Sequence, residues 1–186
     1  EIAKLCNGIV TNDNIIIDDG TGTPTGRGGA VGAWRNAFIN VDGGLTAGLG
    51  MVTGTFETAI TWDQWPSFDK KVREATQATL DDVCGGGTVN CRFTHVYPDG
   101  PAPYYTYVGN YKKDGYFEQQ DAIKKAASDA IISAGGTITH HHAVGRLHKP
   151  WYDVERPELF AESLKAMKKV CDPSGILNPG VLIDPA

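Results

Sequence analysis

Two β-prone runs joined by a short turn constrain the fold of this chain more than any other feature. The runs cover residues 89–97 and 104–111, and the turn between them reads Pro98-Asp99-Gly100-Pro101. Proline, aspartate and glycine at this density favour a reversal of the chain. We therefore expect the two runs to pair as an antiparallel hairpin with a slightly long loop.

Further elements are predicted on both sides of this hairpin from the period of their apolar residues. These are strands over 55–62 and 137–139 and helices over 67–83, 117–133 and 157–170. Strands that alternate with helices but pair through a hairpin favour an antiparallel sheet. The sequence thus predicts an α+β fold, a ferredoxin-like antiparallel sheet with helices packed on one face.

Glycine, serine and proline mark the expected ends of these helices. Ser67 is the predicted N-cap of the first helix, and Gly85-Gly86-Gly87 should end it. Gly135-Gly136 should end the second helix. Pro157 suits the first turn of the third, where its missing N–H has no helical partner to lose.

The first 54 residues differ from the rest of the chain in their density of glycine, aspartate and proline. Such residues favour loops, and residues 31–39 are the one short helix that we expect there. The chain opens on Glu1 with what reads as the tail of a helix without a cap. We therefore expect a glycine-rich region over 1–54, a folded domain over 55–186, and a longer parent protein.

Composition excludes several classes of function. The chain has 186 residues, 41% of them apolar, which is typical of a globular domain. Its formal charge is −5 and it has no basic stripe, so nucleic acid is not an expected partner. Its apolar runs are too short for a membrane span. The four cysteines show neither CxxC pairing nor zinc spacing, which favours reduced thiols in a cytoplasmic protein.

Three consecutive histidines, His140, His141 and His142, are the most informative feature for chemistry. Imidazole titrates near neutral pH, and three neighbouring rings cannot all be protonated cheaply, so at least one should stay neutral and serve as a base. A metal site and a solvent-exposed polar loop are the alternatives. Neighbours on an extended segment point to opposite faces, which disfavours three consecutive ligands for one ion.

Several segments resemble, in chain order, motifs of the FAD-linked oxidases of the vanillyl-alcohol-oxidase superfamily, in its alkyl-dihydroxyacetone-phosphate synthase-like branch. Residues 135–146, GGTITHHHAVGR, are similar to the HHH signature of that branch. Residues 55–63, TFETAITWD, resemble its FETxxxWD strand, and residues 91–105 resemble the strand pair before the signature. The ending DPSGILNPG, residues 172–180, resembles the closing motif of FAD-linked oxidases in general.

The resemblance implies that residues 55–186 are the C-terminal cap domain of an FAD-dependent enzyme and that residues 1–54 are a partial N-terminal part of that cap. An FAD-binding domain outside this chain would hold most of the cofactor, so the chain alone should be inactive. The expected enzyme is an alkyl-dihydroxyacetone-phosphate synthase-like transferase or a hydroxy-acid oxidase or dehydrogenase with a small-molecule substrate. A homodimer remains open, as do a metal-dependent hydrolase and a non-catalytic binding module.

The same resemblance assigns roles to individual residues. The implied catalytic residues are Tyr104, His140, His141 and His142; the implied cofactor contacts are Arg146 and Asn178; the implied substrate contacts are His95 and Arg92; no metal ligand is implied. One departure bears on the substrate. Gly43 stands where the ether-lipid enzymes place an arginine against the substrate head group, which weakens that substrate assignment and leaves the flavin assignment in place.

Overall fold

The computed structural model describes residues 46, 48–112 and 114–184. The chain divides into two compact units, Glu1–Val41 and Asp42–Ala186, and the described residues all belong to the second. The helix predicted over residues 31–39 and Gly43 lie outside the described residues. The predicted division into regions 1–54 and 55–186 therefore stays a prediction.

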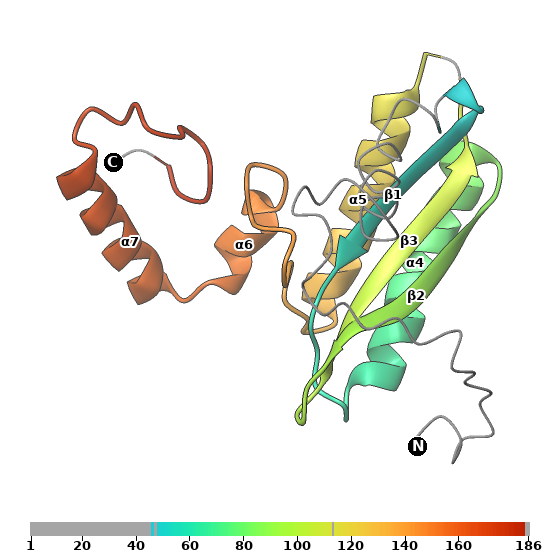
Figure 1. The fold of residues 1–186 in the computed structure, drawn as a ribbon, viewed down its shortest axis with the longest axis horizontal. Helices are drawn as coiled ribbons and strands as arrows, with labels where there is room; N and C mark the ends of the chain where they lie inside the picture. The colour runs from blue at the N-terminus through green and yellow to red at the C-terminus, as the bar shows by residue number, and fades with distance from the viewer. Residues whose placement is uncertain (1–45, 47, 113, 185–186) are drawn as a thin grey trace, which may run out of the picture. The chain divides into compact units, whose positions relative to one another are not determined.

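An antiparallel sheet organises the described residues (Figure 1). Its strands are β1 (Met51–Glu57), β2 (Gly87–Val96) and β3 (Pro101–Asn110), in the spatial order β1-β3-β2. β2 and β3 are joined by the predicted turn, so the hairpin is confirmed. Beyond β1 the pairing continues as backbone hydrogen bonds from Thr58 to Pro103, from Ile60 to Pro101 and from Trp62 to Asp99.

Two long helices, α4 (Trp65–Cys84) and α5 (Tyr116–Ser133), pack side by side on one face of this sheet (Figure 1). Successive side chains of a strand point to opposite faces of the sheet, so every second side chain faces the core shared with the helices. The largest fully buried side chains of this core are Tyr105, Tyr107, Phe68, Leu80, Ile123, Ile131, Val52 and Val72. The α+β class, with helices packed on an antiparallel sheet, is confirmed. The order β1-α4-β2-β3-α5 is that of a ferredoxin-like layer without its final strand.

Two local predictions were wrong. Ser67 lies inside α4 and donates its hydroxyl to the Gln64 carbonyl, because the helix begins at Trp65 with proline in its first turn. Residues 137–139 do not form a strand. They lie beside the extension of β1, where Thr137 donates to the Ala59 carbonyl and the Thr58 hydroxyl donates to the Thr137 carbonyl, too few bonds for a ladder.

The C-terminal part contains α6 (Lys149–Glu155), which the sequence did not predict, and α7 (Glu158–Cys171). Pro157 is the N-cap of α7 and precedes its first turn. Two apolar side chains of α7, Phe160 and Met167, are at least half exposed. Within the described residues, α7 packs against no other helix or strand. None of the described helices is long and apolar enough to cross a bilayer.

Candidate functional site

The face of the sheet opposite α4 and α5 carries most of the predicted site. Tyr105 is fully buried in the helix-covered core, so its neighbour Tyr104 points to the other face. Glu57 of β1 and Arg92 of β2 are the cross-strand partners of Tyr104 and share its face. An irregularity between Phe93 and His95 sets His95 opposite Ala102, so His95 also joins that face. The three strands therefore present an acid, a phenol, a guanidinium and an imidazole on one surface.

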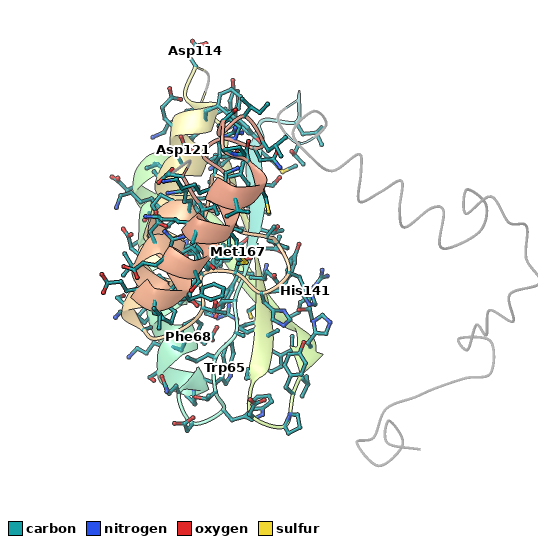
Figure 2. All side chains as sticks on the ribbon, turned by 90° about the vertical axis from the view of Figure 1, so that its left-hand side faces the viewer. Trp65, Phe68, Asp114, Asp121, His141 and Met167 are labelled. Carbon is teal, nitrogen blue, oxygen red and sulfur yellow. The ribbon has the colours of Figure 1, made fainter. Side chains whose placement is uncertain are left out.

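The histidine run reaches this face because the chain passes close to the core at Gly136. A Cβ at Gly136 would lie 2.5 Å from Phe68 Cε2, and Phe68 is a buried core residue of α4. Glycine thus lets the segment cross the end of β1 to the open side. Figure 2 shows His141 on the opposite side of the strands from Phe68 and from Asp121 of α5.

Glu57 fixes the path of the histidine run. Its Oε1 accepts the backbone N–H of His140 at 3.1 Å and that of His142 at 2.8 Å. The side chain of Glu57 is 1% exposed, and its Oε2 lies 3.5 Å from His140 Nδ1. A buried carboxylate needs such donors to offset its lost hydration. The sequence reasoning missed this role, although an acid in a β-prone run that is otherwise apolar and neutral was an available signal.

His148 closes the same loop from its far end. Its ring is buried, and Nδ1 lies 2.7 Å from the Ala143 carbonyl oxygen, so Nδ1 carries the proton and donates. Ala143 has a φ of 60°, a left-handed conformation that a non-glycine residue adopts at some cost in free energy. Burial lowers the pKa of His148, which keeps the ring neutral near pH 7. Glu57 and His148 together hold residues 140–148 in one conformation.

Two of the three consecutive histidines meet His95 from β2. The ring centroids of His95 and His141 are 4.5 Å apart, those of His140 and His141 are 4.0 Å apart, and those of His95 and His140 are 5.3 Å apart. The Tyr97 hydroxyl lies 3.0 Å from His140 Nε2, a contact that the sequence reasoning also missed. The histidines that meet are therefore not three consecutive residues, since His95 of β2 joins His140 and His141 of the loop.

His142 points instead to Tyr104. Their rings meet edge to face with centroids 5.1 Å apart, and the Arg92 guanidinium carbon lies 4.8 Å from the centroid of the Tyr104 ring. Burial lowers the pKa of His142; Lys124, His148 and His141 add to that effect, while Glu57 opposes it. His142 is therefore neutral near pH 7 and able to accept a proton beside a phenol and a fixed cation.

The predicted cofactor residues lie where the histidine loop contacts the C-terminal tail, with Arg146 on the loop and Asn178 on the tail. Arg146 donates from Nη2 to the Pro179 carbonyl at 2.8 Å, next to Asn178, and Leu182 donates its N–H to the Gly145 carbonyl. These bonds hold the tail against the start of the loop that follows the histidines. Among the described residues, no hydrogen bond or ring contact joins Arg146 or Asn178 to Tyr104 or to the histidines. The structure thus brings the two predicted cofactor residues beside each other on neighbouring segments.

Two hollows adjoin this region. A cavity of about 500 Å³ lies between the hairpin turn and the ends of α4 and α5, with Tyr97 and Glu155 in its wall. None of the predicted catalytic side chains lines it. A smaller hollow of about 200 Å³ is bounded by Asn90, Cys91, Arg92, Tyr104 and Thr106. The smaller hollow, which includes a predicted catalytic residue and a predicted substrate contact, fits the candidate site better than the larger cavity does.

Comparisons with known proteins show the family of the chain. The family of FAD linked oxidases, C-terminal domain, matches residues 1–182. An alkyldihydroxyacetonephosphate synthase from Caenorhabditis elegans is 36% identical over 139 residues, which cover 73% of this chain and 23% of the relative. The glycolate oxidase subunit GlcD of Bacillus subtilis (strain 168) is 41% identical over 66 residues, which cover 34% of this chain and 14% of the relative. A solved alkyldihydroxyacetonephosphate synthase structure aligns over 67% of this chain and 19% of its own, with a TM-score of 0.46 and 18% identity.

Proposed function

Because the chain belongs to the FAD-linked oxidase C-terminal domain family, we propose that it is the substrate domain of an FAD-dependent enzyme and supplies the acid–base side of the active site. The chain spans 23% of the length of its Caenorhabditis elegans relative, so most of such an enzyme would lie outside it. A separate N-terminal domain would hold the bulk of FAD. When bound, the flavin supplies the electron-accepting or carbon-binding chemistry.

The observation that supports this proposal is the convergence of Tyr104 and the histidines on one open face. Tyr104 is half-buried, and His141 and His142 are exposed. Flat rings at an uncovered surface fit a planar isoalloxazine ring that approaches from another domain. Arg146 and Asn178 would contact the cofactor at the margin of that surface.

The chemistry assigned to this chain is proton transfer and anion binding. Neutral His142 accepts a proton from the substrate or from the Tyr104 phenol, and Tyr104 relays or returns it. Arg92 carries a fixed positive charge over the Tyr104 ring, and this charge attracts an anionic substrate. Glu57 keeps His140 and His142 in place through their backbone.

The substrate class that fits these groups is a small anionic molecule. The name of the Bacillus subtilis relative contains glycolate, which is a carboxylate. The name of the Caenorhabditis elegans relative contains alkyldihydroxyacetonephosphate, which is a phosphate ester. Arg92 suits either head group, since a guanidinium binds both in a bidentate manner. Gly43, in place of the arginine expected in ether-lipid enzymes, favours the smaller carboxylate.

The test compares the turnover of two tyrosine-to-phenylalanine variants of the intact, flavin-loaded protein. Tyr104→Phe removes the phenol and should lower the rate of the chemical step by about 10²–10⁴-fold, the usual contribution of a general acid–base group. Tyr111→Phe is the matched control, because Tyr111 follows the opposite end of β3 and its ring packs against Tyr116. Flavin absorbance would confirm equal cofactor content in both variants.

The expected result is a large loss of turnover for Tyr104→Phe, with no change for Tyr111→Phe. Equal turnover of the two variants at equal flavin content would contradict the role of Tyr104. A protein that carries no flavin after purification and after incubation with FAD would contradict the wider proposal.

A further inference from the structure

The smaller hollow on the open face is built from two pairs of facing side chains. Arg92 of β2 lies opposite Tyr104 of β3, and Asn90 lies opposite Thr106 in the same register. Side chains two residues apart on a strand point to the same face, with a spacing of about 6.6–6.8 Å. The hollow therefore has one end with a cation and a phenol and a second end with a neutral amide and a hydroxyl. The proposed function uses the first end only.

None of these four side chains takes part in a hydrogen bond within the described part of the chain. Arg92 has no acidic partner among the described residues, and its guanidinium lies over the Tyr104 ring instead. By contrast, Glu57 and Thr53 of the same face are engaged, Glu57 with the histidine loop and Thr53 with the Thr46 hydroxyl. The donors and acceptors of the hollow are thus available to a molecule that enters it.

The two neutral side chains suit a hydroxyl group. Thr106 is half-buried and its hydroxyl both donates and accepts, while the exposed Asn90 amide offers two N–H donors and one carbonyl acceptor. A substrate hydroxyl can pair with either residue, as donor or as acceptor. An alkyl group at the same place would leave these polar groups unpaired once the partner domain covers the face. A site built for a hydroxyl rejects an analogue without it for this reason.

The size of the hollow and the spacing of its side chains limit the molecule. A volume of about 200 Å³, at about 30 Å³ for each water-sized atom, holds roughly six or seven non-hydrogen atoms. A carboxylate on Arg92 and a hydroxyl two carbons further along span the strand spacing with a hydrogen bond of about 2.9 Å at each end. A three-carbon hydroxy acid meets both limits, whereas a long alkyl chain exceeds the volume.

We propose that Asn90 and Thr106 select a hydroxy acid that carries a hydroxyl group on its third carbon over one that carries an alkyl group there. The orientation of the acid rests on the proposed function, in which Arg92 binds the carboxylate and Tyr104 faces the second carbon. Asn90 and Thr106 thereby determine specificity and take no part in the chemical step.

The experiment measures binding rather than turnover, with two acids that lack a hydroxyl next to the carboxylate. The acids are 3-hydroxypropanoate and butanoate, which have equal numbers of non-hydrogen atoms and differ in a hydroxyl or a methyl group on the third carbon. Their dissociation constants are measured by calorimetry on the intact protein with FAD present. The wild-type protein should bind 3-hydroxypropanoate more tightly, by about 3- to 10-fold for each uncharged hydrogen bond made.

Thr106→Val and Asn90→Leu should each reduce this preference by about 3- to 10-fold, mainly by weakening the binding of 3-hydroxypropanoate. Thr106→Ser keeps the hydroxyl and should keep the preference. Thr88→Val is the matched control, because Thr88 lies on the same face opposite Val108 and outside the hollow. Thermal melting checks that each variant is folded, and Thr106→Ala replaces Thr106→Val if the latter is not.

Arg92→Gln separates this selectivity from the binding of the carboxylate. It should weaken both acids alike and leave the preference unchanged, because it removes the anion contact and keeps the hydroxyl contacts. Equal binding of the two acids by the wild-type protein, or an unchanged preference in both Thr106→Val and Asn90→Leu, would overturn the selectivity even where Tyr104→Phe lowers turnover. Failure of the wild-type protein to bind either acid would overturn it too. A preference that follows these expectations in a protein without flavin-dependent turnover would contradict the proposed chemistry and support the selectivity.

Discussion

Removal of the Glu57 carboxylate should loosen the histidine loop and destabilise the protein. In Glu57→Ala the backbone N–H groups of His140 and His142 lose the acceptor that they now share at 3.1 and 2.8 Å. A buried donor left without a partner costs about 1–3 kcal/mol. Water can reach the exposed side of His142, so we expect a combined loss of about 2–4 kcal/mol, below the sum of two full penalties.

The assay combines urea unfolding of the intact protein with hydrogen exchange of residues 137–143. Glu57→Ala should lower the unfolding midpoint and speed exchange in that segment. Glu57→Gln keeps an acceptor oxygen at the same place, so it should cost about 1 kcal/mol and leave exchange nearly unchanged. Unaltered stability and unaltered exchange in Glu57→Ala would refute the view that this carboxylate positions the loop.

Two further predictions concern pH and packing. Burial is the main cause of the lowered pKa of His148. Stability should therefore be complete above about pH 6.5, the unfolded-state value, and decline as the pH falls below it. His148→Asn should flatten that slope in unfolding experiments. Gly136→Ala would place a methyl group 2.5 Å from a ring carbon of buried Phe68, so it should cost about 1–3 kcal/mol in denaturant unfolding. Gly115→Ala is its control, since the nearest atom there is 3.8 Å away; equal midpoints for the two alanine variants would refute the packing argument.

The sequence predicted the hairpin and the two core helices because their signals are local. The turn from Pro98 to Pro101 joins two β-prone runs, and Gly85, with a φ of 69°, ends α4 as expected. The failures are also local in origin. Pro66 sets the start of α4 and displaces Ser67 into the helix, and the seven residues of α6 are too few to show a period.

The candidate site was predictable in part. The motif at residues 140–142 and its likeness to a known signature gave the histidines, and the same likeness gave Tyr104. The pairing of His95 with His140 and His141 was not predictable, because it depends on how a distant loop crosses β1. The burial of Glu57 under that loop is likewise a tertiary effect, and residues 91–97 gave no sign that Tyr97 would meet His140.

The central claim is that the face bearing Tyr104 and His142 meets the flavin. The most direct test is the structure of the intact protein with FAD bound. We expect the isoalloxazine ring to lie within about 4.5 Å of the Tyr104 and His142 side chains, the range of direct contact. A flavin located on the α4 and α5 side of the sheet, or one separated from both side chains by a packed layer of protein, would contradict the account.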